Sequence, residues 1–439
     1  MKTFSWVSVS SALLLSVGLI GCSGGESSSS DGGSGGGDEP VELEFLVADS
    51  VNTRGLEAVA EAAEEELNIS VTFDIRPGGP EGENVVKTRL ATGEIADMMI
   101  YNAGALLETI NPTRNFVDLS EEPYMDKMME NYKETVSFGD GVYGVPSQSS
   151  NVGGWLYNKT IYEELGLEIP ETWDELMENM QAVKDAGYTA AVGAFDEISR
   201  TQIPVLADYY NVQKLAPDFA EEYTAGDAKF ADTPAALRSF EKAYELGPGG
   251  NDFYNEDFNA TTHEQGMAML ATGEAAHFAN LSNVLPTIED NHPKQVENIG
   301  IFPQPADGEH EPGFTVWMPN AILISQSSEN KEAAKKWVEF YMSDEGQRIF
   351  AENFDSIGPY VVEGVEIPDD AYAAVKQMQP YFDEGRTAPA LEFVSPIKGA
   401  NLPQILSEVG GGFMSPEEGA EMYDQDAERQ AQQLGIEDW

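Results

Sequence analysis

The 439-residue chain is short of cysteine, histidine and basic residues. Its single cysteine excludes an intramolecular disulfide and a cysteine-based zinc site. Its four histidines stand at no metal-ligand spacing. Lysine and arginine total 24 against 77 acidic residues, and the formal net charge is −53. Nucleic acid is therefore a poor partner, because phosphate binding needs an excess of basic side chains. We expect no cofactor and no metal.

The acidic residues are spread along the whole chain rather than gathered in one run. This distribution indicates a solvated acidic surface, and so large an excess suggests a salt-rich habitat that screens self-repulsion. An acidic pocket for a cationic ligand is the alternative interpretation.

The chain also has no apolar run long enough to span a bilayer. Residues 1–21 are typical of a bacterial export signal, with Lys2 before a short apolar stretch. Its end, Leu-Ile-Gly-Cys, resembles a lipobox, which predicts lipidation of Cys22 and anchoring outside a bacterial membrane. Residues 22–40 are rich in Ser, Gly, Asp and Glu and predict a flexible tether.

Signatures of enzymes are missing as well. The chain has no His-Glu-X-X-His, no Gly-X-Ser-X-Gly elbow and no phosphate-binding Gly-X-X-X-X-Gly-Lys loop. A glycoside hydrolase with a pair of catalytic carboxylates is not excluded, because 77 acidic residues allow many pairings. Aromatic residues make up 10% of the chain, which suits sugar stacking, although most of these rings are expected in the core.

Hydrophobic periodicity predicts an α/β protein. Strands are expected over 41–48, 69–75 and 98–101, with helices over 56–67 and 85–90 between them, an order that implies a parallel sheet. The later predictions are strands over 155–157, 190–195 and 277–279, an extended run over 314–324, and helices over 173–183, after 330 and after 416.

Several segments, in a fixed order, resemble motifs of one family. They are LATGEIAD at 90–97, YGVP at 143–146, LYNK at 156–159, PETWDEL at 170–176, ATGEAA at 271–276, NKEAA at 330–334 and SDEGQ at 343–347. Together they resemble the extracellular solute-binding proteins of bacterial ABC importers, specifically the carbohydrate family of maltose- and multiple-sugar-binding proteins.

The resemblance implies two α/β lobes joined by a hinge, with a ligand cleft between them. Lobe one is expected over 41–152 plus 314–362, and lobe two over 153–313 plus 363–439. It implies a monomeric binding protein without enzymatic activity, which hands a sugar or oligosaccharide to the permease subunits.

The resemblance places candidate ligand contacts first at strand ends of lobe one. Asp49, Ser50 and Asn52 follow the first strand, where a turn or a helix cap is the alternative. Tyr101 is the expected stacking residue, with Asn102 beside it.

The remaining candidates lie in lobe two and at the crossings, the segments where the chain is expected to pass from one lobe to the other. Small polar residues at the first crossing suit hydroxyl recognition or a plain loop, and Asn283 stands where the family usually has a tryptophan. Phe314 or Trp317 could supply that ring, with core packing as the alternative for Trp317, and each arginine has a surface or structural ion pair as its alternative role. The set is Gln148, Ser150, Asn151, Arg200, Asn280, Ser282, Asn283, Phe314, Trp317 and Arg386.

Two other functions stay open. The acidic charge and the missing tryptophan allow another ligand on the same scaffold, such as a polyamine, a metal chelate or a glycerophosphodiester. The abundance of acids and aromatic rings allows an extracellular polysaccharide hydrolase or lyase.

Overall fold

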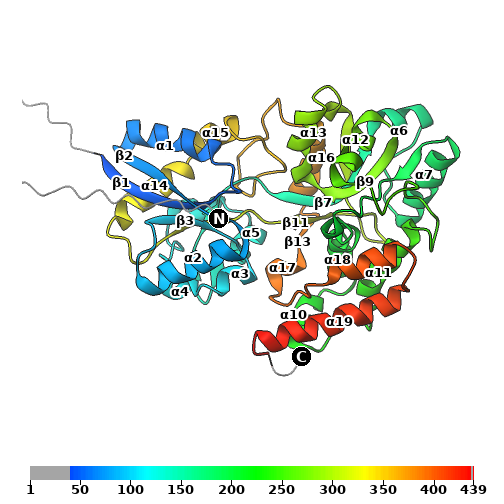
Figure 1. The fold of residues 1–439 in the computed structure, drawn as a ribbon. Helices are drawn as coiled ribbons and strands as arrows, with labels where there is room; N and C mark the ends of the chain where they lie inside the picture. Colours follow the sequence, from blue (N-terminus) through cyan, green and yellow to red (C-terminus); the bar gives the residue numbers. More distant parts are fainter. Residues whose placement is uncertain (1–39, 437–438) are drawn as a thin grey trace, which may run out of the picture. The chain divides into compact units, whose positions relative to one another are not determined.

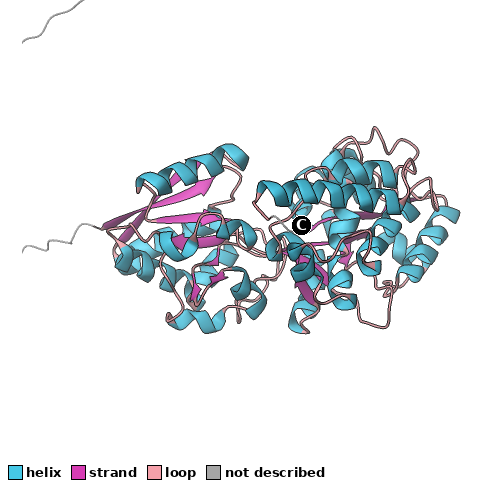
Figure 2. Cartoon of the chain, turned by 90° about the horizontal axis from the view of Figure 1, so that it is seen from below, coloured by secondary structure: helices cyan, strands magenta, loops and turns pink. Residues whose placement is uncertain are grey.

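A computed structural model describes residues 40–436 and residue 439 (Figures 1 and 2). Residues 40–439 form one compact unit. The predicted signal peptide, Cys22 and nearly all of the tether lie outside the described residues. In the described part of the chain, no helix has the length and apolar character needed to cross a membrane.

The first sheet has five strands in the order β2-β1-β3-β12-β6. The three strands nearest the N-terminus are parallel, which confirms the predicted strand–helix order. The last two strands are antiparallel additions from later in the chain. The strands are β1 (Val41–Ala48), β2 (Ile69–Arg76), β3 (Met98–Tyr101), β6 (Val145–Pro146) and β12 (Ala321–Ile324).

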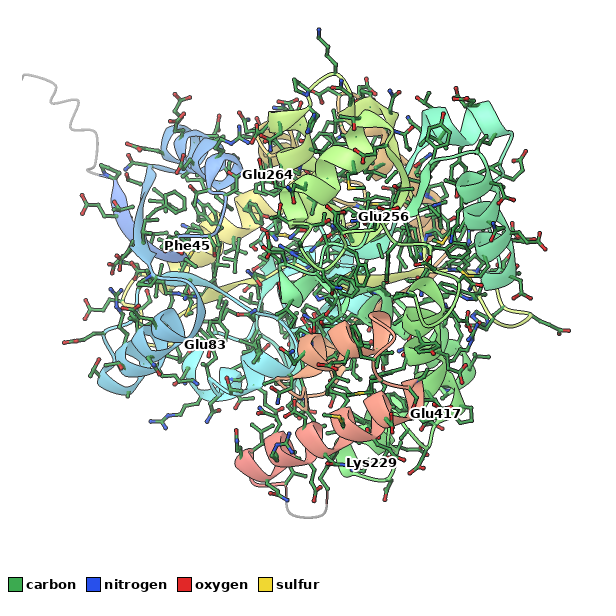
Figure 3. The ribbon with its side chains drawn as sticks, turned by 45° about the vertical axis from the view of Figure 1, so that its right-hand side comes forward. Phe45, Glu83, Lys229, Glu256, Glu264 and Glu417 are labelled. Carbon is green, nitrogen blue, oxygen red and sulfur yellow. The ribbon has the colours of Figure 1, made fainter. Side chains whose placement is uncertain are left out.

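Helices cover both faces of this sheet (Figure 1). On one face Phe45, labelled in Figure 3, stacks on Phe73 at 5.4 Å and meets Trp337 of α14 (Lys331–Tyr341) edge-on at 5.6 Å. On the other face Arg89 of α2 (Gly79–Thr92) pairs with Asp74 at 2.5 Å. Alternation along β2 therefore separates an apolar side from a polar side that faces α2.

The second sheet has six strands and is built around β7 (Asn151–Asn158). This strand pairs antiparallel with β9, β10 and β11, and residues 152–158 are buried. The other strands are β8 (Thr189–Ala191), β9 (Ala275–Leu281), β10 (Ile299–Phe302), β11 (Phe314–Trp317) and β13 (Thr387–Pro389). A separate ladder joins β4 (Ser137–Phe138) to β5 (Gly141–Val142).

Helix starts follow the local sequence. The predicted capping box at Thr172 and Glu175 is present at the start of α7, and Ser415 and Glu418 form another before α19. The remaining helices are α1 (Arg54–Leu67), α3 (Ala105–Glu108), α4 (Pro112–Asn115), α5 (Glu130–Thr135), α6 (Lys159–Leu165), α7 (Trp173–Asp185), α8 (Ile203–Ala207), α9 (Tyr209–Leu215), α10 (Phe219–Ala225), α11 (Pro234–Leu246), α12 (His263–Thr272), α13 (Leu285–Asn291), α15 (Asp344–Glu352), α16 (Ala373–Asp383), α17 (Leu391–Val394), α18 (Leu402–Gly410) and α19 (Pro416–Gln433). Short 3-10 turns are η1 (Pro123–Lys127), η2 (Ile198–Arg200), η3 (Ser282–Val284) and η4 (Val296–Asn298).

Two predicted strands differ from the structure. The run over 314–324 divides into β11 and β12, because Pro319 between them has no N–H for a ladder. The strand expected over 190–195 ends at Ala191, and the N–H of Gly193 donates instead to Asn255 Oδ1 at 2.8 Å.

Three adjacent segments of the described chain join the two sheets. Ser147–Ser150 lead from β6 to β7, 318–320 from β11 to β12, and 353–372 from α15 to α16. The N–H of Ser147 donates to Asn320 O at 2.9 Å, and the N–H of Ser150 to Pro359 O at 2.9 Å. The sheets also move the expected lobe boundaries: β7 and β11 both belong to the second sheet, so the crossings lie at 147–150 and 318–320 rather than at 152 and 314. Below, lobe one is the half built on the first sheet and lobe two is the half built on the second.

Candidate functional site

Polar side chains follow the carboxyl ends of β1 and β3 in lobe one. Asp49, Ser50 and Asn102 are exposed there. Asn52 is exposed too, but its Oδ1 accepts the N–H of Arg54 at 3.2 Å, so it forms a turn before α1, which was its alternative role. Asp49, Ser50 and Asn102 therefore remain open to a ligand at the strand ends, where α/β sheets bind ligands.

Tyr101 does not offer the stacking face expected of it. Only 1% of the residue is exposed, and it pairs with Ala321 inside the first sheet. Burial raises the pKa of its hydroxyl. The register of β1 to β3 turns this ring into the layer beneath α2, so the predicted stacking role is wrong for this structure.

Two serine hydroxyls of the first crossing, residues 147–150, bond to the protein itself. Ser150 is fully buried, and its Oγ donates to Pro359 O at 2.6 Å. The Oγ of the buried Ser149 accepts the N–H of Ile357 at 3.2 Å. These bonds tie the first crossing to the third, which corrects the predicted ligand role of Ser150. Gln148 is half-buried and stays a candidate.

Three predicted residues of lobe two come together at the start of β7. Ser282 Oγ donates to Asn151 Oδ1 at 2.9 Å and accepts the N–H of Val152 at 3.0 Å. The N–H of Asn283 also donates to Asn151 Oδ1, at 3.1 Å. The buried Ser282 therefore orients Asn151, whose Nδ2 has no hydrogen-bond partner among the described residues. Asn283 is exposed beside it.

Trp317 supplies an aromatic face next to this cluster. It pairs with Asn151 across the β7–β11 ladder and is half-buried. Its indole Nε1 donates to Glu392 Oε1 at 3.1 Å. The ring lies over Gly153, where an added Cβ would come within 2.7 Å of Cζ3. The ring is thus held at one edge and placed by a glycine, which suits a fixed stacking surface.

Phe314, the other ring proposed for stacking, lies in the core. It is fully buried and meets Tyr381 edge-on at 4.9 Å. Its position at the start of β11 turns it away from the crossing, so its expected ligand role is wrong.

Asn280 and the two predicted arginines have structural partners. Asn280 is 1% exposed, and its Nδ2 lies 2.8 Å from His263 Nε2. Because burial lowers the pKa of His263, its neutral ring can accept this bond. Arg200 pairs with Glu197 at 3.8 Å, although its buried Nε makes no hydrogen bond within the described residues.

Arg386 takes the surface role that was its alternative. Its Nε donates to Glu384 Oε2 at 2.7 Å, and its guanidinium lies 4.2 Å from the centre of the Tyr381 ring. Neither contact points to a ligand.

Two further residues belong to the candidate site and were missed from sequence. Glu392 comes from a short helix far along the chain, and no local pattern links it to Trp317. Arg76 ends β2 just before a Pro-Gly-Gly-Pro turn, and it is 7% exposed. A basic residue at the end of a strand before such a turn was the signal that could have identified it.

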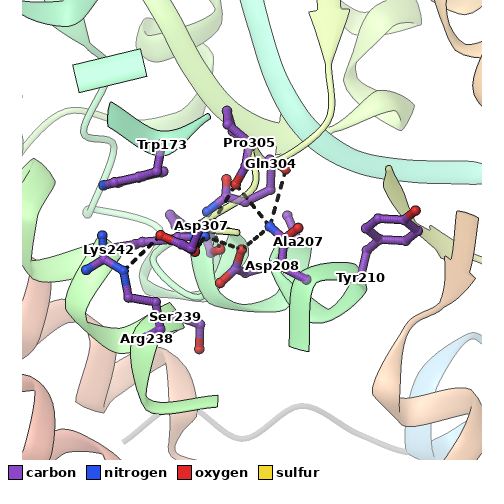
Figure 4. Close-up of polar contacts among 12 residues, drawn as sticks. Trp173, Ala207, Asp208, Tyr210, Arg238, Ser239, Lys242, Gln304, Pro305 and Asp307 are labelled. Atoms are coloured by element: carbon purple, nitrogen blue, oxygen red, sulfur yellow. Dashed lines mark hydrogen bonds and ion pairs between the residues drawn. The ribbon is translucent and has the colours of Figure 1, made fainter. Parts of the chain in front are cut away.

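A buried ionic network lies at the C-terminal end of α8 (Figure 4). Lys242 Nζ of α11 lies 2.7 Å from Asp208 Oδ1, directly after α8, and also pairs with Asp307. Thr315 Oγ1 of β11 donates to Ala207 O at 2.8 Å. These bonds thus link α11 and α8 to β11, the strand that carries Trp317.

Two α/β lobes, joined by adjacent crossings and carrying polar and aromatic side chains at their strand ends, define a binding protein of the two-lobe class. The described residues contain no cluster of three or more His, Cys, Asp or Glu that could hold a metal ion. The family model of the bacterial extracellular solute-binding proteins matches residues 49–348, more than half of the chain. The protein belongs to this family.

Individual relatives agree with this assignment. The multiple sugar-binding protein of Streptococcus mutans is 25% identical over 300 residues, covering 65% of this chain and 67% of that protein. The apo form of RafE from Streptococcus pneumoniae superposes with a TM-score of 0.75 at 21% identity, covering 90% of this chain and 99% of RafE. RafE in complex with raffinose gives 0.70 at 21% identity, over 89% and 99%. These structures establish the two-lobe fold.

Proposed function

We propose that this protein is a lipid-anchored receptor outside a bacterial membrane, which captures a sugar or oligosaccharide between its lobes and delivers it to an ABC importer. The observation that carries the proposal is the half-buried Trp317 beside Asn151 and Asn283. A flat ring suits the C–H face of a sugar, and neighbouring amides suit its hydroxyls. The names of the relatives, a multiple sugar-binding protein and a RafE bound to raffinose, support the same ligand class.

Capture requires the lobes to close on the ligand. The crossings 147–150, 318–320 and 353–372 are short or irregular and lie side by side, so they suit a hinge. Closure would bring Asp49, Ser50 and Asn102 of lobe one to the same ligand as Trp317. The protein acts as a monomer, needs no cofactor and releases its ligand unchanged.

The anchor follows from Cys22, the single cysteine of the chain. Lipidation there, followed by a Gly/Ser-rich tether, would hold the lobes near the permease subunits while the acidic surface keeps them dispersed in salt. Replacing Cys22 by serine should move the protein from the membrane fraction to the soluble fraction. Retention of the C22S variant in membranes would contradict the lipid anchor.

The ligand class is tested by thermal unfolding of the purified protein with a panel of sugars and polyamines. A ligand at about 100 times its Kd should stabilise the folded state by roughly 2.7 kcal/mol. A shift with one class of sugar is the expected result. A rise in the unfolding temperature with polyamines alone would indicate a cationic ligand instead of a sugar. No change in the unfolding temperature with any compound would refute the sugar proposal. Recovery of the unmodified sugar afterwards separates a receptor from a hydrolase.

A further inference from the structure

Two basic side chains are buried in the described part of the chain, and they differ in their surroundings. Lys242 is fully buried and pairs with Asp208 and Asp307. Arg76 is 7% exposed and has no carboxylate within ion-pair distance, 4 Å, among the described residues. Because the chain has 77 acidic and 24 basic residues, a buried arginine without an acid is not explained by a shortage of acids.

The guanidinium of Arg76 has one hydrogen-bond acceptor among the described residues. Its Nη1 donates to Pro77 O at 3.1 Å. Its Nε is buried and has no partner. Burial lowers the pKa of Arg76, although Tyr101, Glu83 and Asp49 oppose that shift from longer range. A buried charge without a counter-ion destabilises a fold, so its presence calls for a reason outside the fold.

Arg76 lies where a ligand of this fold would arrive. It is the last residue of β2 and pairs with Ala48 at the end of β1, next to the exposed Asp49. Immediately afterwards comes the start of α2, whose N-cap residue is Gly78 and therefore has no side chain that could cap the helix. The first turn of a helix leaves N–H groups without intrahelical acceptors and carries a partial positive charge.

Glycines let this corner pack closely. A Cβ at Gly78 would lie 3.1 Å from Asp49 Oδ1, and a Cβ at Gly82 would lie 2.5 Å from Arg76 Nη1. Glu83 of α2, labelled in Figure 3, acts on the pKa of Arg76 but makes no ion pair with it. The corner therefore combines a cation and the N-terminus of α2 with one nearby carboxylate, Asp49, which makes no ion pair with Arg76.

We propose that Arg76 and the first turn of α2 bind the carboxylate of an acidic sugar, so that the preferred ligand is a uronic acid or a uronate-containing oligosaccharide. This inference rests on the proposed sugar-binding function. A carboxylate supplies the missing counter-ion, which the hydroxyl of a neutral sugar cannot do. Asp49 is then free to accept a hydroxyl of the same sugar ring.

The charge is tested first on the unaltered protein. Calorimetry compares mono- to tetrasaccharides of galacturonate and glucuronate with their methyl esters, which keep the shape and remove the charge. We expect the acids to bind at least tenfold more tightly than the esters, and the difference to shrink in high salt. Equal affinity for acid and ester, or binding of neutral sugars alone, would overturn the inference and leave the sugar receptor standing. Absence of binding by every sugar would refute both.

Variants then locate the contact. R76Q should lose at least tenfold in affinity for the acid and less than twofold for the ester. K87Q removes an exposed charge of α2 and should change neither. Unfolding curves without ligand show whether R76Q is folded. Unchanged uronate affinity in folded R76Q, or an equal loss in K87Q, would overturn the assignment. If R76Q does not fold, the acid–ester comparison on the unaltered protein still decides.

Discussion

Replacing Lys242 by methionine tests the buried ionic network most sharply. The side chains of Lys242 and Asp208 are 0% and 1% exposed, and their charged atoms lie 2.7 Å apart. Methionine matches the length of the stem but leaves Asp208 buried without its main counter-ion. Breaking a buried pair in this way costs about 3–5 kcal/mol. We expect the free energy of unfolding of K242M to fall by this amount, measured by urea denaturation at pH 7.

The loss should depend on pH in a defined direction. Burial already raises the pKa of Asp208, with Lys242 opposing the shift. Without Lys242 the folded-state pKa rises further above the unfolded value, so the folded state binds a proton that the unfolded state does not. Stability of K242M relative to the unaltered protein should therefore recover as the pH falls from 7 through that raised pKa.

Two controls separate charge from packing. The double variant K242M/D208N removes the unpaired carboxylate and should regain part of the lost stability. K335M breaks the more exposed pair with Glu122, whose side chains are 29% and 22% exposed, and should cost less than about 1 kcal/mol. Equal losses in K242M and K335M, or no recovery in the double variant, would refute the reasoning. Fluorescence can follow the change locally, since Lys242 Nζ lies 5.2 Å from the centre of the Trp173 ring.

Three further predictions follow from single residues. Burial lowers the pKa of His277 to about 4 from 6.5, so the protein should lose stability as the pH falls below 6.5. Relative to H277Q, the loss should be about 2 kcal/mol at pH 5. Identical pH profiles of stability for the two proteins would contradict this. W317A should weaken sugar binding by about three- to tenfold in calorimetry, whereas F413A, which removes a ring that is 76% exposed, should not. S282A should lower sugar affinity although Ser282 itself does not contact the ligand, because Asn151 loses a hydrogen bond that orients its side chain. Unchanged affinity would count against this orienting role of Ser282.

Much of the fold could be predicted from local sequence. The strands over 41–48 and 98–101 match the structure residue for residue, because alternation and short apolar runs bounded by polar residues are strong signals. The capping box at Thr172 likewise fixed the start of a helix. Pairing between distant segments was less accessible: residues 314–317 were expected in lobe one, whereas β11 pairs with β7 in the second sheet.

The site was predicted by position and corrected by burial. Asp49, Asn102, Asn151 and Asn283 lie where a ligand can reach them, since they follow or begin strands. Four other candidates lie at similar points of the chain but are buried: Tyr101, Ser150, Asn280 and Phe314. A shift of one residue along a strand exchanges the buried and the exposed face, and the sequence alone does not show the strand register. Glu392 could not be predicted, because only the tertiary fold brings it to Trp317.

The most direct test of the account is a structure of the protein with a bound sugar, taken from the class that gives the largest thermal shift. The account predicts a pyranose face on the Trp317 ring, with Asn151 within hydrogen-bond distance of a hydroxyl and the lobe-one strand ends on the opposite side. A sugar bound elsewhere on the protein, or bound between the lobes without contact to Trp317, would contradict the central claim.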